Sequence, residues 1–220
     1  IYLLINYTYN FDLMLNYHTW LNSKISSENL TIVKASAYIL RFSVIMSSTN
    51  SFVFKAPLSY VSSQLSLRKN IKNALTVLNQ AIKVIPLDAI PIISQNLSYF
   101  LQMLTENDFD DTSRVILKII KFYLEREHTD DSKQIYYKCF SSLKKGNVGT
   151  IYLLHVIYDI RSDLFQDRTD ELISSLLEFD DTTGCNLILK ICRNLVVFNF
   201  DINKFISILI SKKLFAQLKE

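Results

Sequence analysis

Glycine and proline are scarce in this chain, whose 220 residues include only three of each. Sheet-rich folds need these residues at most of their turns, and doubly wound nucleotide-binding folds need glycine-rich loops. Helices joined by short polar connections need few of either. The sequence therefore predicts an all-α fold.

Cysteine is also too rare to build a disulfide framework, because the chain has three cysteines and no C-x-x-C pair. Cys185 and Cys192 are seven residues apart, which places them on one face of a helix. No neighbouring His or Cys completes a set of four zinc ligands. We predict small buried side chains, no metal, and an intracellular location, either cytoplasmic or nuclear.

Long apolar runs are missing as well. A helix that spans a bilayer needs about 20 consecutive apolar residues, and the most apolar stretches here are interrupted by Arg41, by Pro86 and Pro91, or by Lys190 and Arg193. The first residues lack the basic start and the cleavage site of a signal peptide. They also lack an initiator Met, so we expect a piece of a longer protein. We predict no membrane span.

The charged residues give a net charge of +3, from 24 basic and 21 acidic side chains, and we take the two signs to be interspersed along the chain. Nucleic-acid patches are typically basic runs of about five to eight residues, which this sequence does not contain. We therefore predict solvated helix ends at the tightest basic groupings, which are Arg68-Lys69 with Lys72, Lys144-Lys145 and Lys212-Lys213.

Long apolar patterns with helical spacing recur along the chain. Their starts lie 39, 42, 36 and 35 residues apart, which is just long enough for two antiparallel helices and their turns, the unit of a helical solenoid. The five patterns occupy residues 31–46, 70–85, 112–126, 148–160 and 183–198.

Further amphipathic segments alternate with these five patterns. This alternation predicts helical hairpins throughout, with a first helix followed by a second. We expect one domain over residues 1–220, a stack of about five to six hairpins in which each contacts mainly its neighbours. The additional segments read DLMLNYHTWLNS, APLSYVSSQLS, DAIPIISQNLSYFLQML, DSKQIYYKCFSSL, RTDELISSLLEF and DINKFISILISKKLFAQL.

The tetrapeptide FDDT occurs twice, at residues 109–112 and 179–182, and ILKI follows each copy, at residues 116–119 and 188–191. Both copies of FDDT fall where a first helix ends and a second begins. Oxygen atoms of Asp and Thr accept hydrogen bonds from the N–H groups of a first helical turn, and the preceding Phe suits the hydrophobic-staple position. We therefore predict helix caps at both copies.

The paired aspartates also suggest a divalent metal or a phosphate. A Mg²⁺ site needs further carboxylates or a phosphate nearby, and the two acidic pairs belong to different hairpins. The same acidic capping pattern, without the Phe, occurs before two other predicted helices, at Asp130-Asp131 and at Asp201. These patterns favour capping over metal binding.

Residues 170–198 read DELISSLLEFDDTTGCNLILKICRNLVVF. A helix ends in the pair Leu176-Leu177, a short acidic connection follows, and a long helix closes on Asn194-Leu195. This passage resembles an armadillo repeat, and most of the chain resembles the armadillo/HEAT α-solenoids. The resemblance implies a curved, right-handed stack of about five to six hairpins that binds proteins on its concave face.

In importin-α-like armadillo proteins, a Trp and an Asn one turn apart form a ladder that grips extended peptides. Asn194 matches the Asn position, whereas Lys190 stands where the Trp would be, and another repeat has Thr76 and Gln80. The single Trp, Trp20, lies elsewhere. The resemblance therefore does not extend to recognition of nuclear signals by such a ladder.

The positions aligned with the ladder are polar. We predict that Arg41, Gln80, Lys121 and Asn194 line the concave face, where the two cations favour an acidic segment of a protein partner. The predicted function is a non-catalytic scaffold or adaptor subunit of a larger complex. A helical regulatory or recruiting region of a large enzyme is one alternative, and a nucleic-acid-contacting helical repeat is another.

Catalytic patterns are not evident. The three histidines, His18, His128 and His155, are scattered and have no Ser or Cys nucleophile at a recognisable spacing. His155, within IYLLHVIYDI, is typical of a hydrogen-bonded core histidine. Residues 146–149 lack the third Gly and the Lys-Ser/Thr of a nucleotide loop and predict an ordinary turn. We predict no enzyme activity, cofactor or small-molecule substrate.

Overall fold

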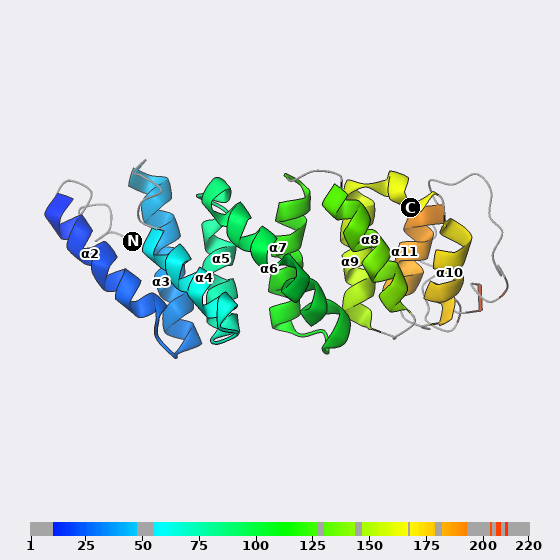
Figure 1. The fold of residues 1–220 in the computed structure, drawn as a ribbon, viewed down its shortest axis with the longest axis horizontal. Helices are drawn as coiled ribbons and strands as arrows, with labels where there is room; N and C mark the ends of the chain where they lie inside the picture. Colours follow the sequence, from blue (N-terminus) through cyan, green and yellow to red (C-terminus); the bar gives the residue numbers. More distant parts are fainter. Residues whose placement is uncertain are drawn as a thin grey trace. The chain divides into compact units, whose positions relative to one another are not determined.

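The computed structural model describes residues 11–47, 55–126, 130–143, 147–166, 168–178 and 182–192, together with residues 203, 206, 207 and 210. Within these ranges all regular elements are helical (Figure 1). The prediction of an all-α fold is confirmed for this part of the chain. Among the described helices, none combines the length and the apolar character that crossing a bilayer requires.

The observed helices match the predicted ones closely at their starts. The largest difference between a predicted and an observed helix end is in α5. The predicted segment extends to residue 85, whereas the helix ends at Ala81 and a turn follows through Ile85. The elements are α2 (Phe11–Ile25), α3 (Leu30–Ser47), α4 (Lys55–Ser66), α5 (Ile71–Ala81), α6 (Pro86–Glu106), α7 (Asp111–Leu124), α8 (Asp130–Ser142), α9 (Val148–Ile160), the 3₁₀ helix η3 (Ser162–Phe165), α10 (Thr169–Glu178) and α11 (Thr182–Cys192).

The chain divides into two compact units. Unit 1 comprises Ile1–Tyr99 with Arg114–Tyr123, and unit 2 comprises Phe100–Ser113 with Leu124–Glu220. The boundary falls inside α6 and α7. A single domain over residues 1–220 stays a prediction.

Unit 1 contains two helical hairpins, α2–α3 and α4–α5. Within each hairpin the helices contact each other, and α3 also contacts α5, so the second helices pack together. The buried side chain of Asn73, on α5, donates a hydrogen bond from Nδ2 to the carbonyl of Ser27 at 2.9 Å. This bond ties the second hairpin to the turn of the first. The buried apolar core includes Leu21, Val33, Leu40, Val61 and Leu75.

Unit 2 repeats this arrangement with the hairpins α8–α9 and α10–α11, and α9 contacts α11. Two side chains of α9 reach backbone carbonyls of α11. Nε2 of His155 lies 3.0 Å from the carbonyl oxygen of Thr183, and the hydroxyl of Tyr158 donates to the carbonyl of Lys190 at 3.0 Å. Polar bonds as well as apolar packing therefore hold these second helices together.

The two ILKI segments occupy corresponding positions in α7 and α11. In the first copy Ile116 and Ile119 are fully buried, and in the second Ile188 and Ile191 expose 0% and 1% of their surfaces. The intervening Leu and Lys are less buried in both copies. The repeated sequence thus places the same pair of side chains in the core of each unit.

The first FDDT copy caps α7, as predicted. Asp110 precedes the helix, and its Oδ1 accepts a hydrogen bond from the backbone N–H of Ser113 at 2.8 Å. In the opposite direction, Oγ of Ser113 accepts a hydrogen bond from the backbone N–H of Asp110 at 3.3 Å. Thr112 adds a bond from Oγ1 to Asp110 Oδ2 at 3.0 Å. The result is a reciprocal cap of the capping-box kind, with Ser in place of Glu.

The other predicted caps are less fully described. Residues 179–181 of the second FDDT copy lie outside the described residues, and α11 begins at Thr182. Asp130 is the first residue of α8. Asp201 and most of the predicted last helix also lie outside the described residues.

The staple predicted for Phe109 is wrong. The position that a staple contacts, four residues after the cap, is Arg114, which is not apolar. Phe109 instead stacks on Tyr152 of α9, with ring centroids 4.5 Å apart and an interplanar angle of 16°. An aromatic partner from another helix therefore replaces the local contact.

The glycine-containing turn before α9 is an ordinary helix start. Asn147 caps the helix, because its Oδ1 accepts from the N–H of Gly149 at 2.7 Å, while its Nδ2 donates to the carbonyl of Asn107 at 2.7 Å. The N–H group of Gly149 is therefore already bonded inside the chain. The sequence predicts an ordinary turn at residues 146–149; residue 146 lies outside the described residues, and the helix already begins at Val148.

Candidate functional site

Acidic residues are absent from residues 29–87, which contain seven basic residues. The rest of the chain has the remaining 17 basic residues and all 21 acidic ones. The expectation that the two signs are interspersed is therefore wrong. This signal was readable in the sequence, but a search for short basic runs does not detect cations spread over several helices. They are Lys34, Arg41, Lys55, Arg68, Lys69, Lys72 and Lys83.

The two units consequently differ in charge. Unit 1 has 11 basic and 3 acidic residues, a formal charge of +8, and unit 2 has 13 basic and 18 acidic residues, a formal charge of −5. The two values sum to the net charge of +3 of the whole chain. A surface dominated by one sign attracts ligands of the other sign and speeds their association. Unit 1 is thus suited to an anionic partner.

One side of α3 carries alternating cations and apolar groups, which we call the α3 stripe. Lys34, Tyr38, Arg41 and Ile45 follow the spacing i, i+4, i+7 and i+11, which keeps them on one face of the helix. Tyr38 and Ile45 each expose 54% of their surfaces. Lys34 is exposed and Arg41 is half-buried. An adjacent side of the helix packs into the core through Val33, Ala37 and Leu40.

The neighbouring helix α5 has a matching polar stripe. Lys72, Thr76 and Asn79 follow the same spacing, and Lys83 continues it in the turn after the helix. Lys72 and Lys83 are exposed, and Thr76 and Asn79 are half-buried. Each residue of the α5 stripe lies 38 positions after its counterpart in the α3 stripe.

A hydrogen bond links the two helices beside these stripes. Nη1 of Arg41 donates to Oε1 of Gln80 at 3.3 Å, and Gln80 exposes only 2% of its surface. Nε of Arg41 is buried, and among the described residues it has no hydrogen-bond partner. Within the same part of the chain no carboxylate forms an ion pair with Arg41. A half-buried guanidinium held by one neutral amide is incompletely compensated, so an added anion would stabilise it.

The four predicted partner-binding residues have different positions. Arg41 and Gln80 are brought together, and the buried Gln80 reaches a partner only through Arg41. Lys121 is exposed on the part of α7 that belongs to unit 1. Asn194 lies outside the described residues. Lys190, at the position of the ladder Trp, forms an ion pair with Asp159 on α9.

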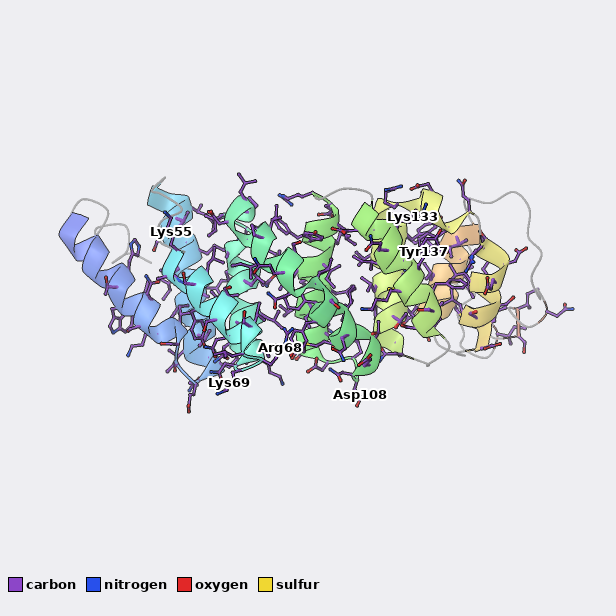
Figure 2. All side chains as sticks on the ribbon, in the orientation of Figure 1. Lys55, Arg68, Lys69, Asp108, Lys133 and Tyr137 are labelled. Carbon is purple, nitrogen blue, oxygen red and sulfur yellow. The ribbon has the colours of Figure 1, made fainter. Side chains whose placement is uncertain are left out.

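The turn between α4 and α5 holds a second basic group. Figure 2 shows Lys55 at one end of α4 and Arg68 with Lys69 at the other. Arg68 is exposed at a helix end, as predicted, but its guanidinium lies 3.6 Å from the ring centroid of Tyr99 and donates to Asn96 Oδ1 at 3.3 Å. Its backbone is left-handed, with φ 55°, which costs a non-glycine residue about 1–2 kcal/mol. Inside unit 1, Arg68 is therefore engaged by an aromatic ring and an amide, whereas Arg41 is held by one amide.

Among the titratable groups of unit 2, Cys139 is buried, and His155 and Cys192 are half-buried. The carbonyl of Thr183 can only accept a hydrogen bond, so Nε2 of His155 carries the proton. The predicted hydrogen bond of this histidine is confirmed, although the side chain is half-buried rather than fully in the core. Burial raises the pKa of the Cys139 thiol to about 12 and that of Cys192 to about 11, so neither is a reactive thiolate. Among the described residues, no group of three or more His, Cys, Asp or Glu is placed to hold a metal ion.

His155 should make stability depend on pH. Burial lowers its pKa from the ordinary 6.5 and outweighs the opposing hydrogen bond to Thr183. Below pH 6.5 the unfolded chain takes up a proton that the folded chain does not, so the free energy of unfolding falls as the pH falls, until the lowered pKa is passed. Urea unfolding at several pH values between 7.5 and 5 should show a shallower fall for His155→Gln than for wild type. Burial also lowers the pKa of His18, so part of the pH dependence of the free energy of unfolding should remain in both proteins. Equal slopes would contradict this role for His155.

No protein-family model, curated protein or solved structure matches this chain. The armadillo/HEAT resemblance therefore stays a prediction.

Proposed function

We propose that this chain is a non-catalytic protein-binding scaffold, or an adaptor subunit of a larger complex, that holds an acidic segment of its partner against the second helices of unit 1. The observation that carries the proposal is the half-buried Arg41, bonded to Gln80, in a stretch of the chain without acidic residues. A carboxylate from a partner would give Arg41 a charge-assisted bond, which is stronger than its bond to a neutral amide.

The arrangement of the hairpins supports a scaffold role. In each unit the second helices of consecutive hairpins contact each other, α3 with α5 and α9 with α11. Continued along the chain, this packing would give the right-handed solenoid of about five to six hairpins that the sequence predicts, with the second helices on the concave side. Stacked hairpins of this kind form extended binding surfaces, on which residues from successive repeats contact one long ligand.

Nucleic acid is the second candidate, because a formal charge of +8 in unit 1 also suits a polyanion. Two features favour an acidic protein instead. The cations of unit 1 are spread over several helices rather than clustered, and exposed apolar side chains interrupt them on α3. The bases of a single strand can stack on Tyr38, but Ile45 is aliphatic and is better covered by the side chains of a protein.

Fluorescence anisotropy with two labelled probes tests the proposal. One probe is a synthetic poly-glutamate peptide, and the other is a single-stranded oligonucleotide of similar length, each measured at low and at moderate salt. We expect the peptide to bind wild type with at least the affinity of the oligonucleotide. We expect Arg41→Glu combined with Lys121→Glu to weaken peptide binding by about tenfold or more, because two attractive charges become repulsive.

Lys133→Glu combined with Lys138→Glu is the matched control. Both lysines are exposed on α8 in the acidic unit 2, so reversing them should leave peptide binding within about twofold of wild type. Thermal unfolding of each variant checks that folding is retained. Peptide binding that survives reversal at Arg41 and Lys121, or oligonucleotide binding that is much tighter and steeply salt-dependent, would contradict the proposal.

A further inference from the structure

We infer that the acidic segment is an amphipathic helix that lies along the α3 stripe, with carboxylates against Lys34 and Arg41 and apolar side chains against Tyr38 and Ile45. This inference rests on the proposed function and names the kind of partner that the site takes. It adds the apolar half of the contact, which the proposed function does not require.

The spacing on α3 fits a helical ligand. Lys34 and Arg41 are seven residues apart, as are Tyr38 and Ile45, and seven residues of α-helix rise about 10 Å. Two helices that pack at a shallow angle stay in contact over several turns and match each other every seven residues. A partner helix that alternates acidic and apolar residues every three or four positions can therefore contact all four groups. Its acidic residues would lie against Lys34 and Arg41, and its apolar residues against Tyr38 and Ile45.

The exposed apolar groups favour a partner that brings apolar surface. Tyr38 and Ile45 expose 54% each although they are large, and each lies within four residues of a cation of the same stripe. Large amphipathic side chains such as Tyr are enriched where one protein binds another. A purely charged ligand would neutralise the lysine and the arginine but would leave both apolar groups in water.

The charged residues around the α3 stripe favour a negatively charged ligand. Helix α3 has no acidic residue, and neither do α4 and α5. The α5 stripe adds Lys72 and Lys83 beside the bonded pair of Arg41 and Gln80. An acidic helix on α3 thus meets further cations at its flank, whereas a basic amphipathic helix would be repelled.

Helix α8 in unit 2 offers a matched control. Lys133 and Tyr137 have the same four-residue spacing as Lys34 and Tyr38, and Tyr137 exposes 45% (Figure 2). This pair lies in the unit with a formal charge of −5. A Lys→Glu and a Tyr→Ala substitution can therefore be made at matching positions in both units, and only those on α3 should affect binding.

The experiment compares two synthetic peptides of identical composition. The first places Glu and Leu in a heptad pattern that gives an amphipathic helix, and the second has the same residues in an order without that pattern. We expect wild type to bind the amphipathic peptide about tenfold or more tightly than the scrambled one. Tyr38→Ala with Ile45→Ala should abolish this preference, while Lys34→Glu should weaken the binding of both peptides.

The controls Tyr137→Ala and Lys133→Glu should leave both affinities within about twofold of wild type. Equal binding of the two peptides to wild type, with both weakened by Lys34→Glu, would overturn the amphipathic helix and leave the acidic-segment scaffold standing. A preference that persists in Tyr38→Ala with Ile45→Ala would place the apolar contact elsewhere and would also overturn the inference. Binding of neither peptide at low salt would contradict the proposed function itself.

Discussion

Replacement of Gly149 by alanine is expected to lower the free energy of unfolding by about 2 kcal/mol. A Cβ atom at this position would lie 2.2 Å from the carbonyl oxygen of Leu104 and 3.0 Å from Oδ1 of Asn147. The first of these atoms belongs to the backbone of α6, so the clash is relieved only if a helix shifts. Urea unfolding of Gly149→Ala against wild type measures the effect.

Gly184→Ala is the matched control, because Gly184 also lies in the first turn of the second helix of a hairpin in unit 2. A Cβ atom there would lie 3.4 Å from the carbonyl oxygen of Leu176, which is an ordinary contact. Alanine favours a helix over glycine by up to about 1 kcal/mol, so this variant should be as stable as wild type or more stable. If Gly149→Ala were equally well tolerated, the close approach of α9 to α6 would be wrong.

Asp110→Ala should destabilise the protein by about 1–2 kcal/mol through loss of the α7 cap. The carboxylate accepts hydrogen bonds from Ser113 N–H, Ser113 Oγ and Thr112 Oγ1. Alanine removes all three acceptor contacts, whereas asparagine keeps one acceptor oxygen and caps helices about as well as aspartate. Asp110→Asn should therefore stay close to wild type in thermal unfolding.

The same pair of variants separates capping from metal binding. If the acidic pair held a divalent cation, asparagine would weaken the site, and added Mg²⁺ would raise the melting temperature of wild type by preferential binding to the folded chain. We expect no shift with millimolar Mg²⁺ for wild type or for Asp110→Asn. A magnesium-dependent rise that Asp110→Asn abolishes would identify a metal site instead.

Most of the helices could be predicted from the sequence because apolar periodicity and capping residues are local signals. The predicted segments at residues 31–46 and 148–160 match α3 and α9 to within one residue at each end. The cap at Asp110 was predictable for the same reason, since a Ser, Thr, Asp or Asn before an apolar helix satisfies N–H groups that lie within a few residues.

Contacts between distant residues could not be predicted in this way. The staple pattern predicts a contact between Phe109 and the first turns of the helix that follows it. In the structure Phe109 stacks on Tyr152 of another helix instead. The positions of Arg41 and Gln80 were predicted to share a surface, yet only packing of α3 on α5 determines that Gln80 is buried and supports Arg41. The absence of acidic residues from residues 29–87 can be recognised in the sequence alone. That these cations belong to one compact unit follows only from the packing of the helices.

Hydrogen–deuterium exchange of the wild-type chain, with and without the amphipathic acidic peptide, tests most directly whether unit 1 holds an acidic helix. Binding should slow amide exchange in α3 and α5 and leave exchange in α8 unchanged, because the peptide covers one face of unit 1 only. Slowed exchange confined to the helices of unit 2, or no change at saturating peptide, would contradict the account.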